Sequence, residues 1–295
     1  MRCVITGIGG FSGHHLARFL REEAGADVFG IDSPRRPQPC SAEWLCRDLG
    51  DRGAICAFLQ RVQPEVIFHL AGKTRGDDLH ELLAANVETT GVLLELAQEL
   101  GCAVLVPGSA AEYGVPEELP LRETHSLRPI TPYGMSKARQ TALALDYARR
   151  GARVFVARAF NLVGPGLPES FFPAQLARRA ATLRDGEELE VPNPDTRRDY
   201  VDVRDAVRAY WEIATRGRAG EVYNVCTGAG TSHEELARLL LEASGRDARL
   251  HRSPQTDPAG LTTVVGSREK IQRELGWSPR LPLADSLRAM LEAPR

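Results

Sequence analysis

A tyrosine and a lysine four positions apart, Tyr133 and Lys137, could together move a proton. Residues at this spacing lie on one face of a helix, and the apolar pattern after Pro132 predicts a helix that continues through Tyr147. A phenol with a pKa of about 10 is a poor base at neutral pH. An ammonium held beside it favours the phenolate, which can then exchange a proton with an alcohol or carbonyl oxygen.

Ser109 could supply a second contact to the same oxygen. It lies about one element before the tyrosine, and its hydroxyl would donate a hydrogen bond. Three such groups around one oxygen suit hydride transfer between a carbonyl carbon and a nicotinamide, provided that the chain also builds a dinucleotide site. The tyrosine and lysine alone are a weak signal, because most pairs at this spacing lie on ordinary helix surface. The neighbouring elements therefore decide how the pair is interpreted.

Residues 6–13, Thr-Gly-Ile-Gly-Gly-Phe-Ser-Gly, follow an apolar strand and open a helix. Glycines at these places allow a tight turn, let the backbone approach a pyrophosphate and let the helix pack close to the sheet. The first turn of the helix offers unpaired N–H groups and a partial positive charge to that phosphate. With an acid, Asp32, about 20 residues further on, the pattern predicts a dinucleotide site. We expect its contacts at Gly7, Gly10, Phe11, Gly13 and Asp32.

The choice of dinucleotide depends on residues that follow the second strand. Asp32 would accept hydrogen bonds from the adenosine ribose hydroxyls, which favours NAD(H). Arg35 and Arg36 leave NADP(H) open, because they could pair with a 2′-phosphate, although they could equally lie in a solvated loop. Asp48 and Leu49 follow a short strand-like run, where a carboxylate could reach the adenine amine or simply belong to a loop.

Short apolar runs alternate with amphipathic stretches through residue 160. This alternation predicts a Rossmann-type, doubly wound α/β fold: a parallel sheet with helices on both faces, followed by a smaller mixed α/β substrate-binding lobe. We expect strands at 3–6, 27–31, 66–70, 102–106 and 154–158, and helices at 11–24, 52–62, 79–100 and 133–150. The strand ends carry Gly7, Asp32, Ala71, Ser109 and Asn161, at the edge where such sheets bind ligands.

The sequence changes character after the Gly-Pro-Gly at 164–166. A helix at 173–184 and a turn rich in Pro, Asn and Asp precede a further strand, helix and strand at 199–203, 205–215 and 221–226. We therefore expect a dinucleotide-binding domain over 1–161 plus a returning segment at about 199–226. The substrate-binding lobe would take 162–198 and 227–295.

Composition and charge argue against several classes of function. A formal net charge of -2 over 295 residues gives no reason to expect nucleic acid or a membrane as a partner. The six cysteines form no Cys-x-x-Cys pair and show no metal-like spacing with the seven histidines, so we expect no metal site and a reducing, cytoplasmic location. The chain starts almost directly with a strand and has no apolar run near about 18 residues, so we expect neither a signal peptide nor a membrane span.

Six segments together resemble the extended short-chain dehydrogenase/reductase superfamily, which includes NAD-dependent epimerases and dehydratases. They are residues 6–13, His69-Leu70-Ala71-Gly72, Asn86-Val87, 109–114, Tyr133-x-x-x-Lys137 and Arg158-Ala159-Phe160-Asn161. Residues 108–114, 160–166, 198–205 and 221–228 are similar to GDP-6-deoxy-4-keto-D-mannose reductases in particular. The Glu-Leu-Gly-Trp-Ser-Pro at 274–279 is the usual close of many sugar-nucleotide members. The resemblance covers the whole chain.

The resemblance implies an NAD(P)-dependent oxidoreductase or epimerase that acts at C4 of a nucleotide-linked sugar. Its implied catalytic residues are Ser109, Tyr133 and Lys137, and the last two also contact the cofactor. Leu70, Ala71 and Gly72 complete the implied cofactor contacts.

On the substrate side, the resemblance implies that Asn161 and Arg198 contact a diphosphate, and Ser109 the sugar. Charge-assisted bonds from an arginine suit that group, although Arg198 could instead pair with a carboxylate. Arg178 is a further candidate. Glu112 should point away from the catalytic face but could still touch the substrate.

Two departures from the family pattern bear on the substrate and the reaction. Dehydratases need an acid/base pair beside the catalytic hydroxyl, but Ala110 and Ala111 follow Ser109 here, so we do not expect 4,6-dehydration. GDP-6-deoxy-4-keto-D-mannose reductases usually carry Arg-Pro-x-Asp, where this chain has Asp-Pro-Ala-Gly at 257–260. Arg252 could replace the missing arginine, or the substrate could differ from a GDP-sugar.

Three functions stay open on these residues. A reductase of a nucleotide-linked 4-keto-6-deoxy sugar is the first, and a nucleotide-sugar 4-epimerase would use the same catalytic residues. A non-catalytic dinucleotide-binding sensor is the remote alternative. Family members pair two helices across a dimer as a four-helix bundle, so we expect a homodimer through 79–100 and 131–150. The extra apolar residues on these helices could instead pack within one monomer.

Overall fold

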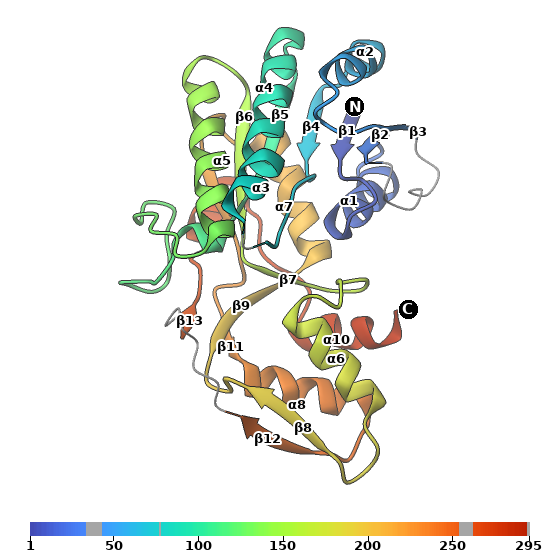
Figure 1. The fold of residues 1–295 in the computed structure, drawn as a ribbon, viewed down its shortest axis with the longest axis vertical. Coiled ribbons are helices and arrows are strands. Elements are labelled where there is room, and N and C mark those ends of the chain that lie inside the picture. The colour runs from blue at the N-terminus through green and yellow to red at the C-terminus, as the bar shows by residue number, and fades with distance from the viewer. Residues whose placement is uncertain (34–42, 77, 254–261, 294–295) are drawn as a thin grey trace.

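Seven parallel strands form the central sheet of the computed structural model, which describes residues 1–33, 43–76, 78–253 and 262–293 (Figure 1). The strand order is β10-β6-β5-β4-β1-β2-β3, so the chain starts in the middle and winds outward in both directions. The strands are β1 (Arg2–Thr6), β2 (Asp27–Asp32), β3 (Glu43–Cys46), β4 (Val66–His69), β5 (Ala103–Ser109), β6 (Val154–Ala159) and β10 (Val222–Val225). This is the predicted Rossmann-type sheet, and the prediction is confirmed.

Helices cover both faces of this sheet because its strands are apolar on both sides. In β1, Cys3 and Ile5 face α1 (Phe11–Glu22) and α7 (Val203–Arg216), whereas Val4 faces the opposite core. The helices on that second face are α2 (Arg52–Val62), α4 (Thr89–Leu100) and α5 (Pro132–Arg149). No helix in the described ranges is long and apolar enough to cross a membrane.

The helix expected over 79–100 is broken into three parts. α3 (Leu79–Leu83) and α4 flank a π-helical turn, Ala84–Glu88. Asn86 lies in that turn, fully buried, and its amide bonds the backbone N–H and C=O of Lys73 and the hydroxyl of Ser136. A π-turn widens a helix by one residue and is frequent at functional sites. Apolar spacing alone did not predict it.

The second body, drawn in the lower half of Figure 1, contains two small sheets and three helices among the described residues. One sheet joins β7 (Asn161–Val163), β9 (Arg197–Asp202), β11 (Gly230–Ser232) and β13 (Thr263–Val264), and the other pairs β8 (Glu188–Pro192) with β12 (Arg249–Ser253). The helices are α6 (Phe172–Thr182), α8 (His233–Ser244) and α10 (Leu283–Glu292), which share one core. Residues 199–202 lie in β9 of this body, whereas α7 and β10 return to the central sheet.

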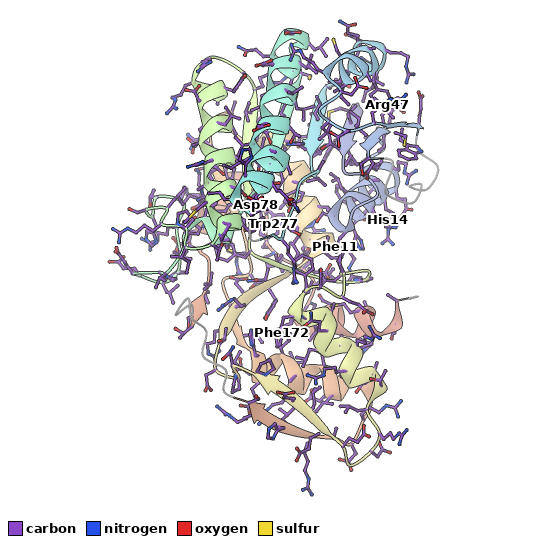
Figure 2. The ribbon with its side chains drawn as sticks, viewed as in Figure 1. Phe11, His14, Arg47, Asp78, Phe172 and Trp277 are labelled. Carbon is purple, nitrogen blue, oxygen red and sulfur yellow. The ribbon has the colours of Figure 1, made fainter. Side chains whose placement is uncertain are left out.

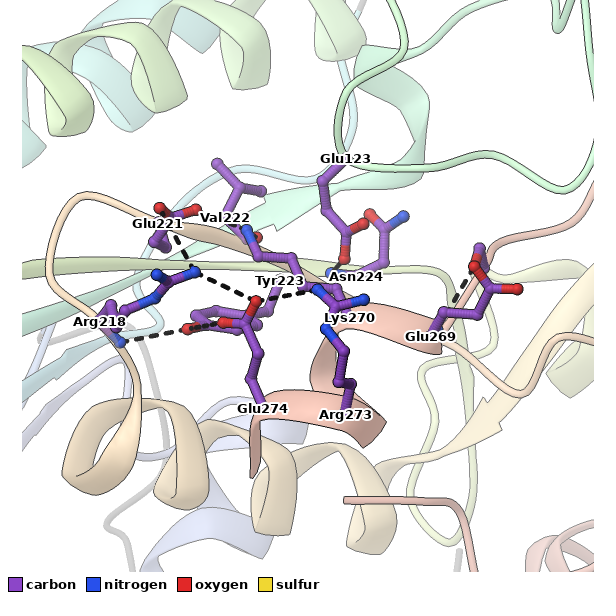
Figure 3. Close-up of polar contacts among 11 residues, drawn as sticks. Glu123, Arg218, Glu221, Val222, Tyr223, Asn224, Glu269, Lys270, Arg273 and Glu274 are labelled. Atoms are coloured by element: carbon purple, nitrogen blue, oxygen red, sulfur yellow. Dashed lines mark hydrogen bonds and ion pairs between the residues drawn. The ribbon is translucent and has the colours of Figure 1, made fainter. Parts of the chain in front are cut away.

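A late helix, α9 (Glu269–Leu275), holds the edge strand β10 in place (Figure 3). The Lys270 ammonium donates to the carbonyl of Val222 at 2.7 Å and to the Glu221 carboxylate at 2.6 Å. The Tyr223 hydroxyl donates to Glu274 at 3.0 Å. The residues after α9 also lie against α7, which packs on the central sheet, because the Trp277 indole donates to the carbonyl of Asp205.

Candidate active site

A tight turn follows β1, and only glycine fits its two closest points. Gly7 has φ +70°, and a Cβ there would lie 2.8 Å from the backbone nitrogen of Ala71. A Cβ at Gly13 would collide with the carbonyl oxygen of Gly7. The turn is closed by a hydrogen bond from Gly10 N to Gly7 O at 2.9 Å. The expected packing of turn, helix and sheet is therefore present.

The first turn of α1 fits a dinucleotide pyrophosphate. Its N-cap is Gly10, which has no side chain to bond the N–H groups, and the first turn contains no acid. Open N–H groups and the helix dipole together favour an anion at this end. Phe11 begins the helix and lies near the junction with the second body (Figure 2). Here His15 bonds the carbonyl of Pro165 at 2.8 Å and ties α1 to the chain entering that body.

Asp32 ends β2 beside the glycine turn, as expected for a residue near the adenosine ribose. It is buried, and its two oxygens accept hydrogen bonds from Gly9 N and Ser33 N, each at 2.8 Å. Asp48 is exposed and accepts from Gly50 N at 2.9 Å, while Leu49 packs against the apolar core. Arg35 and Arg36 lie outside the described residues.

The loop after β4 lies directly against the glycine turn. Ala71 N donates to the Thr6 hydroxyl at 3.1 Å, and Leu70 N donates to the Thr6 carbonyl at 3.1 Å. At Gly72, which has φ +159°, a Cβ would lie 2.7 Å from the Asn86 amide oxygen. The structure thus brings residues 6–13 close to Leu70–Gly72, the segment in which the family resemblance implies further cofactor contacts.

Ser109 and Tyr133 meet at the carboxyl edge of the sheet. Ser109 ends β5, and Tyr133 lies in the first turn of α5, whose N-cap Thr131 accepts a hydrogen bond from Gly134 N at 3.0 Å. Burial raises the pKa of Tyr133 to about 12, and a hydrogen bond with the Ser109 hydroxyl works in the opposite direction. The phenol is therefore neutral at physiological pH before any ligand is added.

Lys137 lies one helical turn further along and is buried. Its ammonium donates to the Pro107 carbonyl at 2.6 Å and to the side-chain oxygen of Gln140. Burial lowers the pKa of Lys137 to about 8, and the negative charge of Glu112 partly offsets this. Sequence reasoning missed Gln140, although its position three residues after the lysine places it on the same helical face.

The carboxylate of Glu112 is bonded by neighbouring groups of the protein. Glu112 is fully buried, and its carboxylate accepts from both Arg158 Nε at 3.1 Å and Arg158 Nη2 at 2.9 Å. Its other oxygen accepts from Ser109 N at 2.6 Å. Glu112 therefore supports Ser109 through its backbone N–H. A lone arginine within the apolar strand 154–159 was the available signal for its partner.

The three expected diphosphate contacts lie in different settings. Asn161 is half-buried and donates to the Asp199 carbonyl at 3.2 Å, and Arg198 is half-buried on β9, adjacent to the strand that carries Asn161. Arg178 is exposed on α6 and forms an ion pair with Glu169. The structure thus places Asn161 and Arg198 on paired strands and Arg178 on the surface of a helix.

The suggested replacement arginine is already paired with two acids. Arg252 Nη2 bonds Asp195 at 2.8 Å, and Nη1 bonds Glu234 at 2.6 Å. Residues 257–260, where the family arginine is missing, lie outside the described residues.

Two curated relatives match nearly the whole chain and differ in activity. A GDP-6-deoxy-D-mannose reductase from Pseudomonas aeruginosa is 33% identical, over 98% of this chain and 96% of the relative. A dTDP-glucose 4,6-dehydratase from Streptomyces griseus is 36% identical, over 97% of this chain and 92% of the relative.

Solved structures show the same fold with a nicotinamide cofactor or a nucleotide sugar. RMD from Pseudomonas aeruginosa, complexed with NADPH, is 30% identical with a TM-score of 0.86, covering 98% of this chain and 97% of that one. A UDP-glucose 4-epimerase from Thermotoga maritima with UDP-glucose is 27% identical with a TM-score of 0.90, covering 99% and 98%. Residues 3–226 match the NAD dependent epimerase/dehydratase family. The chain belongs to this family and is an NAD(P)-dependent oxidoreductase or epimerase.

Proposed function

We propose that this enzyme reduces the 4-keto group of a nucleotide-linked 4-keto-6-deoxy sugar, as a GDP-6-deoxy-D-mannose reductase does. The observation that carries this proposal is the meeting of Ser109, Tyr133 and Lys137 at the sheet edge, beside the glycine turn that fits a dinucleotide. The likeness to the Pseudomonas aeruginosa reductase supports the substrate class.

Each residue of this group has a distinct task in the proposed reaction. The nicotinamide, when bound, supplies the hydride that reduces C4. Tyr133 gives its phenolic proton to the C4 oxygen, and Ser109 hydrogen-bonds that oxygen so that negative charge can build on it. Lys137 stabilises the resulting phenolate by its positive charge and holds the nicotinamide ribose. Asn161 and Arg198 hold the diphosphate.

Dehydration fits the site poorly despite the dTDP-glucose 4,6-dehydratase relative. That reaction must remove a carbon-bound proton and protonate a leaving hydroxyl. Ala110 and Ala111, which follow Ser109, can do neither. The adjacent Glu112 has both oxygens occupied by Arg158 and Ser109 N. We therefore place the chemistry at C4 alone.

A nucleotide-sugar 4-epimerase is the second candidate, favoured by the likeness to the UDP-glucose 4-epimerase that holds UDP-glucose. An epimerase oxidises C4, turns the keto sugar over and reduces it again, so the cofactor is regenerated in each cycle. The same three residues serve both reactions.

The deciding experiment is cofactor stoichiometry with GDP-4-keto-6-deoxy-mannose. A reductase oxidises one NAD(P)H per product, and the loss of nicotinamide absorbance measures this oxidation. An epimerase causes no net change in NAD(P)H. Replacing Tyr133 with phenylalanine should lower kcat by about 10²-fold to about 10⁴-fold. Full activity in that variant would contradict catalysis by Tyr133. Binding of NAD(P) by the unchanged protein without turnover of any nucleotide sugar would leave the dinucleotide-binding sensor as the interpretation.

The preferred cofactor is proposed from Asp32 alone. A carboxylate at the end of β2 accepts bonds from two ribose hydroxyls but repels a 2′-phosphate, so NAD(H) should have the higher kcat/KM. Measuring kcat/KM with NADH and with NADPH tests this, and a preference for NADPH would contradict it.

A further inference from the structure

A chain of buried polar side chains connects the cofactor side of the sheet to Lys137. Thr6 Oγ1 lies 2.8 Å from His69 Nδ1, and His69 Nε2 lies 2.8 Å from Thr90 Oγ1. Gln140 Nε2 lies 2.7 Å from the same Thr90 hydroxyl, and its oxygen receives the Lys137 ammonium. All five side chains are buried, and they come from β1, β4, α4 and α5.

The contacts of Thr90 fix the direction of two of these hydrogen bonds. The Thr90 hydroxyl has a single proton, which it donates to the Asn86 carbonyl at 2.6 Å because a carbonyl can only accept. Its oxygen must therefore accept the other two bonds. One comes from the Gln140 amide N–H, since the Gln140 oxygen faces the ammonium, and the other comes from a protonated Nε2 of His69.

His69 is then neutral, with its proton on Nε2 and its lone pair on Nδ1. Burial lowers the pKa of His69 to about 3, and the nearby charge of Lys137 acts in the same direction. The Thr6 hydroxyl must donate to Nδ1, which leaves the Thr6 oxygen to accept from Ala71 N at 3.1 Å. Every proton from the cofactor loop to the lysine thus has one assigned place.

We propose that Thr90 and Gln140 are positioning residues for Lys137, and that with His69 and Thr6 they form a hydrogen-bond chain of fixed direction that couples the loop at Ala71 to the lysine. The proposal deepens the function proposed above, because it rests on Lys137 acting in catalysis. Thr90 is the central member, since it accepts from both neighbours at once.

The hydrogen-bond chain gives Lys137 a neutral acceptor, the Gln140 side-chain oxygen, at a buried position. Lys137 is faced by Gln140 and Tyr133 from α5, by Glu112 from the turn after β5, and by the neutral His69 from β4. A hydrogen bond to the charged form of a group favours that form. Losing the Gln140 oxygen, or turning it away, should therefore lower the pKa of Lys137 and release its side chain.

Thr90→Val tests the proposal, and the same substitution at Thr141 on the neighbouring helix α5 is its control. Valine keeps the shape of threonine but leaves Gln140 and His69 without their shared acceptor. Thr141, next to Gln140, is also buried, and its hydroxyl has no hydrogen-bond partner among the described residues. Thr141→Val should therefore leave kcat and KM unchanged, whereas Thr90→Val should lower kcat by about 10-fold to about 100-fold, the range seen when partners behind metal ligands are removed.

Three further readouts separate positioning from general damage to the fold. Thr90→Ser keeps the hydroxyl and should recover most of kcat. Gln140→Met should lower kcat and move the alkaline limb of the pH profile to lower pH. In ¹⁵N spectra, His69 should be the Nε2–H form and should not titrate between about pH 5 and about pH 8.

The outcomes distinguish failure of this inference from failure of the proposed function. If Lys137→Met abolishes turnover while Thr90→Val and Gln140→Met match Thr141→Val, Lys137 is catalytic but the chain does not position it. An Nδ1–H form of His69 would also overturn the inference. If Lys137→Met itself retains full activity, the proposed function fails first.

Discussion

Burial moves the two proton-handling side chains in opposite directions. It raises the pKa of Tyr133 to about 12 and lowers that of Lys137 to about 8. A neutral phenol is the form that gives a proton, so burial prepares Tyr133 for the reduction of a carbonyl. The lysine must keep its own proton to stabilise the phenolate that remains. The sensitive group at this scale is therefore Lys137.

We predict that kcat/KM for carbonyl reduction falls as pH rises through about 8, the pKa of Lys137. Below that pH the ammonium is present, and above it the side chain becomes neutral and no longer stabilises the phenolate. A pH profile with saturating cofactor measures this limb. Lys137→Met should lower kcat/KM by about 10²-fold or more and remove the limb. An unchanged limb in that variant would assign it to another group.

The buried pair Glu112–Arg158 should be a stability determinant. Removing one partner leaves an uncompensated charge, so Glu112→Ala should lower the free energy of unfolding by about 3–5 kcal/mol in a urea titration. The double variant Glu112→Met with Arg158→Met should regain part of the loss, because it removes both charges. Equal losses in the single and double variants would contradict the ion-pair explanation.

Residue types predicted the position of the candidate site where chemistry limits the choice of residue. The glycines, Asp32, Ser109, Tyr133 and Lys137 all lie at one edge of the sheet, as their motifs predicted. The supporting side chains were not predicted. Glu112 and Arg158 are 46 positions apart, and the spacing of two charged residues does not predict that they form an ion pair. Thr90 and Gln140 are common helix residues whose partners depend on how α4 and α5 pack.

At the scale of elements, the β1–α1 turn tolerates little change. Gly13→Ala should lower NAD(P) affinity by at least about 10-fold, because its Cβ would collide with the Gly7 carbonyl and displace the helix. Gly53→Ala in α2 is the control: its Cβ meets only the Asp51 side chain at 3.9 Å, and alanine is the better helix former. Isothermal titration measures both affinities, and equal effects would refute the collision.

Long, regular elements were predictable and short ones were not. The strands of the central sheet and helices α1, α2, α5 and α7 have continuous apolar patterns, and their predicted bounds agree with the structure within a few residues. By contrast, β7, β11 and β13 contain two or three residues each, too few to show a period. The π-turn at 84–88 depends on bonds from Asn86 to distant backbone, which helical periodicity does not encode.

For the whole molecule, we predict a homodimer through residues 79–100, which form α3, the π-helical turn and α4, and through residues 131–150, which contain α5. These helices lie next to each other on one face of the central sheet (Figure 1), and the large apolar side chain of Met135 is 37% exposed on α5. One chain has a mass of 32.3 kDa, and light scattering at micromolar concentration should give twice that mass. A monomeric mass would mean that the apolar residues of these helices serve the packing of one chain only.

The hold of α9 on the edge strand has a consequence for how the protein is made. β10 is the last strand of the central sheet in chain order, yet Lys270 and Glu274, which bond Val222 and Tyr223, come 48 and 51 positions after them. Until the ribosome has synthesised α9, β10 is an edge strand without these contacts, and it can pair with other nascent chains. Chains truncated before α9 should therefore be bound by chaperones and degraded by proteases more readily than chains that include α9.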